Sequence, residues 1–401
     1  MNRKLIISKL KFNERECLAT AVLDTEIDRI IDLSLETKEK ERILANIYVG
    51  KVQKVAEHIN AAFIAIQPNL SCYYSLRKNK TPYITSTPKR PALKAGDEIL
   101  VQVSTEALKN KIPTVTSQIN ISGQYVVLTV NKKGLGVSAK LDHADRDRLK
   151  TLLLPYLKDT CGIIARTNAA TADPEDVKTE VEALFARLEE IYHLGNTRTC
   201  YSLIDAAVTG QIRELRSIKA DELSEIVTDD EEVFASLETY LQDSQSNSLD
   251  KLRYYDDKAW PLAKLYSIES NLEAASNEKV WLQSGGFLMI QQTEAFVVID
   301  VNSGKYQGRR DATETYKRIN FEAAKEIAIQ LRLRNLSGII MIDFINMDNL
   351  EFRDELLSTL QKYLHEDNVR ALVVDITALH IVEITRKKVK KSLAEQMMAI
   401  Q

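Results

Sequence analysis

Two short apolar runs near the C-terminus constrain the fold of this chain most strongly, because each carries an aspartate at or near its carboxyl end. The first run covers residues 296–304 and contains Asp300 and Asn302, and the second covers residues 338–344 and contains Asp343. Both are rich in valine and isoleucine, which predicts buried β-strands, and a long amphipathic helical pattern separates them. Since ligands collect at the carboxyl ends of strands in an open α/β sheet, these three side chains are candidate site residues.

The chemistry of these side chains points to a divalent cation. Hard cations take oxygen ligands, so two aspartates and an asparagine could hold one Mg²⁺ and leave positions for water. A metal-bound water becomes a usable nucleophile near neutral pH, which is the arrangement that metal-assisted phosphodiester hydrolysis needs. The alternative is that the two aspartates only cap strand ends; the presence of Asn302 at this spacing favours the metal site.

Size and composition exclude several classes of protein. With 401 residues, 44% of them hydrophobic, the chain can form more than one domain. The net charge of −3 means that nucleic-acid binding would depend on local basic patches. None of the four cysteines has the spacing of a zinc knuckle or redox motif, so we expect reduced thiols and no zinc. No apolar run is long enough for a membrane span or signal peptide, which predicts a cytoplasmic protein.

The pattern of apolar residues divides the chain into segments. Residues 1–40 alternate as strands do, and residues 44–121 form short strands with turn signals, which suits a small Greek-key barrel of the OB type. Residues 122–215 are mixed, with a helix from about residue 174 to 192. Residues 216–250 are acidic and predicted to be helical. Residues 279–401 alternate strand and helix, which is typical of an α/β fold.

Two features of the C-terminal part carry further predictions. The helix that follows Asp300 has one apolar face, which we expect to lie in the core; its residues are Tyr316, Ile319, Ala323, Ile327 and Leu331. The basic run at residues 386–391 is predicted to be a solvated helical face with some contact to phosphate.

Several ordered motifs resemble the catalytic half of the ribonuclease E/G family of bacterial, single-strand-specific endoribonucleases. The similarity runs from about residue 43 to residue 393. It is strongest at residues 279–286, 299–302, 320–328, 330–334 and 342–345. Several motifs in the right order are far more specific than any one of them.

The resemblance implies an α/β multidomain architecture. Its parts are an RNase-H-like subdomain split between residues 1–42 and 216–278, an inserted OB-fold RNA-binding domain at 43–118, a 5′-end sensor at 119–215, and a DNase-I-like catalytic subdomain at 279–401. It also implies that Asp300 and Asp343 bind Mg²⁺, with Mn²⁺ able to substitute, and that Asn302 orients one of them or the attacking water.

Two sets of RNA-binding residues follow from the same resemblance. Phe63 and Tyr73 would stack on bases and Lys111 would be a basic contact beside the active site, although packing in the core is an open alternative for Phe63. Arg166 and Thr167, with the backbone from Gly123 to Val127, would bind a 5′-monophosphate through bidentate and hydroxyl contacts. The alternative for that pair is an ordinary surface strand end.

The sequence also departs from the family pattern. Ile112 stands where the family has glycine, Thr114 stands at a position that is usually basic, and the sequence ends at Gln401 without the zinc-binding Cys-Pro-x-Cys segment. We therefore expect a short form resembling ribonuclease G, with any homodimer made without a zinc link.

The leading hypothesis is an Mg²⁺-dependent endoribonuclease that cleaves single-stranded RNA to 5′-phosphate and 3′-hydroxyl ends. By resemblance it would favour 5′-monophosphorylated substrates and act in ribosomal RNA processing and messenger RNA decay. One alternative is a catalytically weak RNA-binding protein on the same scaffold, which the altered residues at 112–114 favour. Another is a protein-interaction scaffold that uses the acidic segment 216–250.

Overall fold

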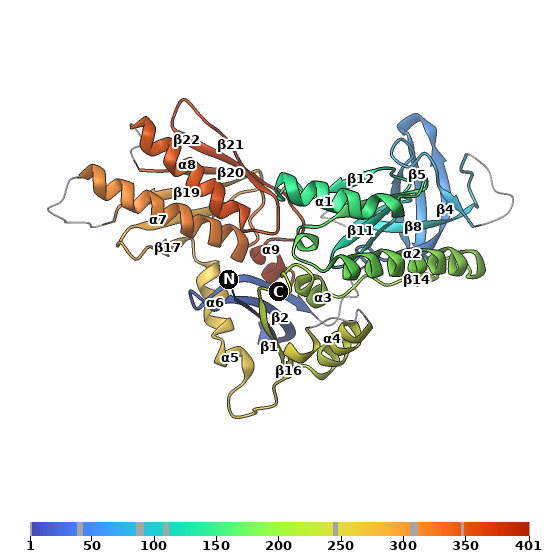
Figure 1. The fold of residues 1–401 in the computed structure, drawn as a ribbon, viewed down its shortest axis with the longest axis horizontal. Coiled ribbons are helices and arrows are strands. Elements are labelled where there is room, and N and C mark those ends of the chain that lie inside the picture. Colours follow the sequence, from blue (N-terminus) through green and yellow to red (C-terminus); the bar gives the residue numbers. More distant parts are fainter. Residues whose placement is uncertain are drawn as a thin grey trace. The chain divides into compact units, whose positions relative to one another are not determined.

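The computed structural model describes residues 2–37, 43–85, 92–106, 112–243, 248–304, 312–345 and 349–400 (Figure 1). They form a mixed α/β protein with four β-sheets, as the sequence predicted at this coarse level. The chain divides into two compact units, one made of Met1–Lys40 and Glu222–Gln401 and the other of Glu41–Asp221. The second unit is thus an insertion in the sequence of the first. The five-part division and the subdomain names remain predictions.

The first unit contains a five-stranded sheet with the order β16-β15-β1-β2-β3. Its strands are β1 (Arg3–Phe12), β2 (Arg15–Asp24), β3 (Arg29–Thr37), β15 (Leu223–Thr228) and β16 (Leu252–Tyr254). The predicted N-terminal strands are therefore confirmed. The prediction that residues 216–250 are helical is wrong for β15, because Ile226 and Val227 are buried beside β1 in parallel pairing. Helix α4 (Glu231–Asp243) follows it, and α5 (Leu262–Leu265), α6 (Ile268–Ser276) and α9 (Leu393–Met398) lie further along the chain.

The same unit contains a six-stranded mixed sheet with the order β17-β18-β19-β20-β22-β21. Its strands are β17 (Lys279–Trp281), β18 (Phe287–Gln292), β19 (Phe296–Asn302), β20 (Gly338–Asp343), β21 (Ala371–Ile376) and β22 (Ile381–Arg386). Helices α7 (Ala312–Leu333) and α8 (Leu350–His365) lie against one face of it (Figure 1). The predicted apolar face of α7 is confirmed for Ile319, Ala323, Ile327 and Leu331, which are fully buried.

The opposite face of this sheet is open in the described residues. Along β19 the side chains alternate, with Val297, Ile299 and Val301 buried and Val298 exposed. On the open face Phe296 keeps 40% and Ile339 keeps 47% of its surface exposed. The expectation of fully buried strands is therefore wrong. When both the odd and the even positions of a strand are apolar, both faces of the sheet are usually buried. Here the helices cover only one face of the sheet.

The second unit contains a closed five-stranded β-barrel, in agreement with the predicted OB-like class. Strands β4 (Ile47–Ala56), β5 (Ala61–Gln67), β6 (Leu70–Ser75), β9 (Thr114–Thr116) and β8 (Glu98–Thr105) pair in that order. The barrel closes because β4 also pairs with β8. Two short strands add to it: β7 (Tyr83–Ile84) pairs with β8, and β14 (Leu203–Asp205) pairs with β4.

A four-stranded sheet completes the second unit, with the order β10-β11-β13-β12. Its strands are β10 (Asn120–Ser122), β11 (Val126–Val130), β12 (Leu135–Val137) and β13 (Cys161–Ala165), and its helices are α1 (His143–Leu153), α2 (Pro174–Thr197) and α3 (Gly210–Leu215). Helix α2 covers the predicted helical segment and begins at Pro174 behind the N-cap Asp173. Its apolar side chains share a core with β11 and β13.

Two simple expectations can be compared with the structure. The four cysteines are free thiols, and Cys17, Cys72 and Cys161 are buried. Across the part of the chain that the structure describes, we find no helix with the length and apolarity that crossing a membrane requires.

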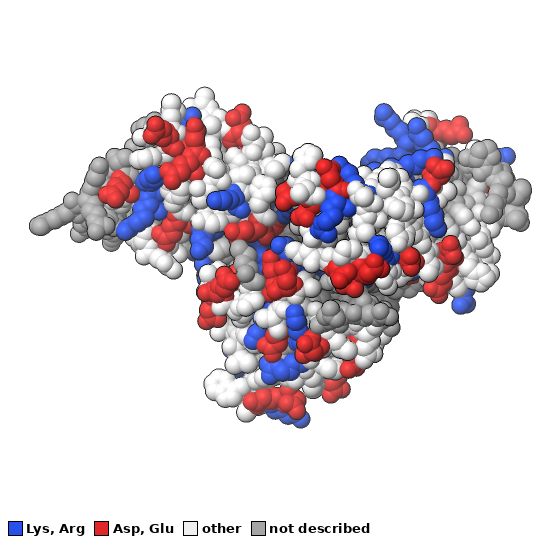
Figure 2. Space-filling model, viewed as in Figure 1, with Lys and Arg blue, Asp and Glu red and all other residues white. Residues whose placement is uncertain are grey.

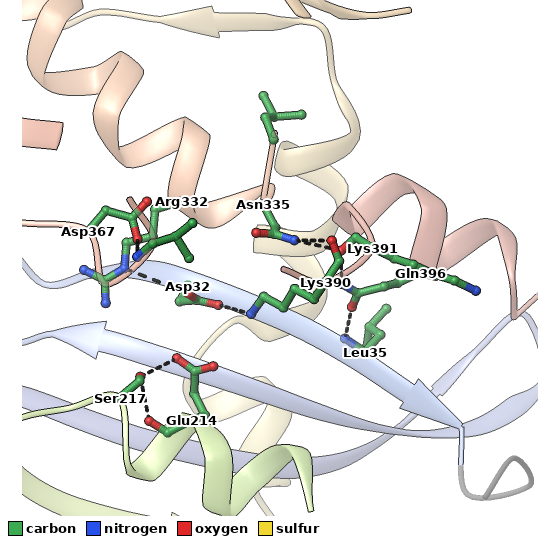
Figure 3. A network of polar contacts seen from close by, with 12 residues as sticks. Asp32, Leu35, Glu214, Ser217, Arg332, Asn335, Asp367, Lys390, Lys391 and Gln396 are labelled. Atoms are coloured by element: carbon green, nitrogen blue, oxygen red, sulfur yellow. Dashed lines mark hydrogen bonds and ion pairs between the residues drawn. The ribbon is translucent and has the colours of Figure 1, made fainter. Parts of the chain in front are cut away.

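A buried polar network ties the C-terminal segment to β3 and the end of α7 (Figure 3). The Asp32 carboxylate pairs with Lys390 at 3.0 Å, and Asn335 donates to the carbonyls of Lys390 and Lys391. Arg386, the first residue of the basic run, is 2% exposed and donates to the Asp367 carboxylate at 2.7 Å. The helical part of that prediction is wrong, because Arg386 is buried at the end of β22. The solvated part holds for Lys387, Lys388 and Lys391, which are exposed.

We expect Arg386→Met to lower the free energy of unfolding by about 3–5 kcal/mol, because it removes a buried cation that pairs with the Asp367 carboxylate. Urea unfolding followed by circular dichroism measures the change. The matched control is Lys387→Met, whose side chain is exposed and which should stay within about 0.5 kcal/mol of the parent. Equal effects of the two substitutions would contradict a structural role for Arg386.

Candidate active site

The parallel pairing of β19 and β20 places the two candidate metal ligands side by side. Their register pairs Asp300 with Asp343, so both lie in one row across the open face of the sheet. Neighbouring strands are about 4.8 Å apart, and both side chains are exposed. The Asn302 side-chain amide donates a hydrogen bond to Asp300 Oδ2 at 2.8 Å. The structure therefore brings together the three residues that the sequence predicted.

Helix α7 fixes the end of β20 through a residue whose role the sequence did not reveal. Asn320 is 4% exposed, and its side chain donates to the Ile345 carbonyl at 2.7 Å and accepts from the Ile345 N–H at 3.1 Å. Ile345 comes two residues after Asp343, so this pair of bonds holds the backbone that carries the aspartate. The sequence signal that could have identified Asn320 is its position as a polar residue beside the apolar face of the helix.

A second residue of α7 holds the turn behind Asn302. The Glu322 carboxylate accepts hydrogen bonds from the backbone N–H groups of Gln283 and Ser284. This turn packs directly on the end of β19, because a Cβ atom on Gly286 would lie only 2.8 Å from the Asn302 carbonyl oxygen. Glycine is therefore needed at 286 for the close approach of these two segments.

The two aspartates fit the requirements of a hydrated divalent cation. Both carboxylates point from the same row of an open sheet face, and the Asn302 bond occupies only one oxygen of Asp300. Among the described residues no group of three or more histidine, cysteine, aspartate or glutamate side chains is placed to hold a metal. Two protein carboxylates would suit Mg²⁺, which keeps several waters and often takes substrate phosphate oxygens.

The residues of the predicted 5′-end sensor meet at one end of the four-stranded sheet. Arg166 Nη1 donates to the Gly123 carbonyl at 2.8 Å, and the Thr167 hydroxyl lies 3.1 Å from the Ser138 hydroxyl. Val127 pairs with Ile164 in the neighbouring strand. Arg166 and Thr167 are half-buried, so their polar groups remain within reach of a ligand.

A carboxylate on α2 organises the turn that carries Gly123, and no pattern in the sequence pointed to it. Glu180 accepts hydrogen bonds from the backbone N–H groups of Gln124, Tyr125 and Val126, at 2.6, 2.8 and 2.8 Å. Burial raises the pKa of Glu180, while these donors and the charge of Arg216 oppose that rise. Three successive amide donors form a site that an anion would favour, and here the protein's own carboxylate fills it.

The barrel carries the two aromatic candidates on its outer face. Phe63 and Tyr73 are register partners on β5 and β6, and both are half-buried. Ala62, Ile64 and Tyr74 fill the barrel core from the opposite parity, so Phe63 is not part of that core. Lys111 lies outside the described residues. Figure 2 shows basic side chains gathered over part of the barrel. Over most of the face of the molecule drawn there, acidic and basic side chains are mixed.

Comparisons with known proteins agree with this arrangement. The profile of the Ribonuclease E/G family matches residues 120–389. Ribonuclease G of Escherichia coli (strain K12) and of Salmonella typhimurium (strain SL1344) are each 30% identical to this chain over 379 residues, which cover 90% of this chain and 76% of the relative. Ribonuclease E of Haemophilus influenzae is 30% identical over 391 residues, covering 95% of this chain and 42% of the relative.

The chain belongs to the ribonuclease E/G family. The profile match includes the paired aspartates, Asn302, the sensor residues, and Asn320 and Glu322 of α7. It begins after the barrel strands β4 to β9. The chain spans less than half of the ribonuclease E relative and about three quarters of the ribonuclease G relatives.

We predict that Glu180→Gln loosens the 123–126 turn, because an amide cannot replace a carboxylate as acceptor for three N–H groups. Hydrogen exchange should show faster exchange of the backbone amides of Gln124, Tyr125 and Val126. The control is Glu182→Gln, an exposed residue on the same helix, which should leave these amides protected. Unchanged exchange in the Glu180 variant would mean that the strands alone fix the turn.

Proposed function

We propose that this protein is a metal-assisted endoribonuclease that cleaves single-stranded RNA to 5′-phosphate and 3′-hydroxyl ends. The observation that carries the proposal is the pairing of Asp300 with Asp343, with Asn302 bonded to the first carboxylate. Membership of the Ribonuclease E/G family supports RNA as the substrate. Roles in ribosomal RNA processing and messenger decay, a cytoplasmic location and a homodimer are finer proposals by analogy with the family.

In this mechanism the protein supplies two negative charges and one orienting amide. Asp300 and Asp343 would hold Mg²⁺, which when bound lowers the pKa of coordinated water and offsets charge on the phosphate. Asn302 fixes the rotamer of Asp300 through its hydrogen bond. Water attacks phosphorus, the bond from phosphorus to the 3′-oxygen breaks, and a proton reaches that oxygen. Asn320 and Glu322 maintain the geometry by holding the segments that follow β20 and precede β18.

We further propose that the second unit recognises a 5′-monophosphate through Arg166 and Thr167. The guanidinium is already oriented by its bond to the Gly123 carbonyl, and its planar fork of donors suits the oxygens of a phosphate. The amide donors of residues 124–126 are held by Glu180. The phosphate would therefore be bound mainly by side chains.

The alternative is a catalytically weak RNA-binding protein on the same scaffold. It is favoured by the barrel segment that departs from the family, where Ile112 is 45% exposed and Thr114 pairs with Tyr73. An exposed isoleucine and a threonine offer no charge to RNA phosphates. This reading predicts affinity for RNA without efficient cleavage.

Asp300→Asn and Asp343→Asn should each abolish Mg²⁺-dependent cleavage while RNA binding is kept, because each removes a metal ligand and leaves the barrel intact. The loss should be at least about 10³-fold, as expected when several kcal/mol of charge stabilisation are removed. Cleavage of a short AU-rich, 5′-monophosphorylated RNA with Mg²⁺ or EDTA measures it, beside a filter-binding assay. The control is Asp354→Asn on α8, an exposed aspartate. Full activity of either active-site variant would refute the assignment, and tight binding without cleavage by the parent would favour the alternative.

Arg166→Ala should remove the preference for 5′-monophosphate over 5′-hydroxyl RNA, because bidentate contacts to the phosphate are lost. We expect the ratio of the two kcat/KM values to fall towards one, while the rate on 5′-hydroxyl RNA stays as in the parent. Arg198→Ala, which removes an exposed arginine at the end of α2, serves as control. An unchanged ratio would move the sensor to other residues.

A further inference from the structure

The open face of the catalytic sheet carries a cluster of one cation and two aromatic rings that the proposed mechanism does not use. Trp281 keeps 64% of its surface exposed. Its ring meets Phe287 edge to face, with centroids 5.4 Å apart. The Lys279 ammonium lies 3.9 Å from the centroid of Trp281 and 3.8 Å from that of Phe287. We call these three residues the aromatic cluster.

The register of the sheet aligns the aromatic cluster with the active site. Trp281 pairs with Phe287, and Phe287 pairs with Asn302. In the next row Lys279 pairs with Met289, which pairs with Asp300, the partner of Asp343. Phe287 lies one strand spacing from β19, about 5 Å across the sheet, and Trp281 and Lys279 lie two spacings away, about 10 Å. An RNA strand whose phosphate reached Asp300 and Asp343 could therefore place a flanking nucleotide on these rings.

The chemistry of the cluster matches an unpaired nucleotide. Every base has a flat π-face that stacks on an aromatic side chain, and a cation beside the ring suits the adjoining phosphate. Lys279 makes no ion pair with a carboxylate in the described part of the chain. A contact of this kind between an exposed cation and aromatic rings is weak. The Lys279 ammonium can therefore move to a phosphate, which uncovers a ring face on which a base can stack.

We infer that Trp281, Phe287 and Lys279 bind one unpaired nucleotide that flanks the scissile phosphate, with the base on the rings and the phosphate at Lys279. This inference rests on the proposed endoribonuclease function and adds a substrate contact to the same site. Base pairing would keep a nucleotide stacked on its neighbours, so the cluster also contributes to selection of single strands. Other apolar side chains on this face, such as Phe296 and Val298, lie on β19 itself, on the side of Asp300 away from Asn302.

The two tryptophans of the chain supply both the probe and its control. Trp260 is 65% exposed, almost the same as Trp281, but lies before α5 rather than in the catalytic sheet. We expect Trp281→Ala to raise KM about tenfold with a much smaller change in kcat, as loss of one stacked base predicts. Trp281→Phe should recover most of the loss, and Trp260→Ala should behave as the parent.

Binding is measured separately from cleavage. In a Trp260→Phe, Asp300→Asn protein Trp281 is the sole tryptophan. With excitation at the red edge of tryptophan absorption, where tyrosines do not absorb, titration with a single-stranded oligoribonucleotide should quench its emission. A series of oligonucleotides with one abasic position should lose the quenching at a single site. Duplex RNA should quench little.

The outcomes distinguish the inference from the proposed function. An unchanged KM for Trp281→Ala, together with fluorescence that RNA does not alter, would overturn the inference while cleavage by the parent still supports the endoribonuclease. If RNA quenches Trp281 but neither the parent nor any variant cleaves RNA, the result would support the nucleotide site and overturn the proposed hydrolase. Emission of Trp281 that is already shielded without RNA, or that changes with protein concentration alone, would show that the protein itself covers the cluster and would overturn the inference.

Discussion

The parallel register of β19 and β20 is the constraint on which the proposed chemistry depends. It pairs Asp300 with Asp343 because buried residues alternate in both strands, with Val297, Ile299 and Val301 in one and Ile340 and Ile342 in the other. A slip of one residue would move Asp343 to the face covered by the helices and bring Ile342 to the open face. The apolar side chains that stabilise the sheet therefore also determine which carboxylates meet.

Helix α7 both packs in the core of the catalytic sheet and holds the segments next to the candidate metal ligands. Ile319, Ala323 and Ile327 are fully buried in the core of the sheet. On neighbouring positions, Asn320 and Glu322 bond to the backbone of segments that adjoin β20 and β18. Since the same helix makes the crossover from β19 to β20, its packing and its polar anchors both act on the ends of the strands that carry the candidate ligands. A rigid element that holds catalytic groups in this way limits misplacement, to which rates are very sensitive.

The sequence predicted the residues whose pattern is local and missed those whose role depends on a distant partner. Asp300, Asn302 and Asp343 could be found because strand ends collect ligands, and the barrel because its short strands alternate. Glu180 could not be found, because its three amide partners lie more than 50 residues away. The same limit explains the error at Arg386 and Lys390: these cations resemble part of a solvated helical face until Asp367 and Asp32 are seen beside them. The strand at residues 223–228 was missed because acidic neighbours masked a short apolar segment that needs β1 to bury it.

The covered and open faces of the catalytic sheet serve different physical purposes. Apolar side chains under α7 and α8 stabilise the fold, whereas Phe296, Ile339 and Trp281 on the other face remain in water. Exposed apolar area of this kind contributes nothing to folding, and contiguous patches of it mark surfaces that bind a partner. On this sheet the exposed rings lie in the row of Asn302 and the two aspartates lie in the neighbouring row, so the surface that would hold the metal is continuous with the surface that could hold a base. A flexible single strand can satisfy both at once, because its bases are free to stack while its backbone stays extended along the sheet.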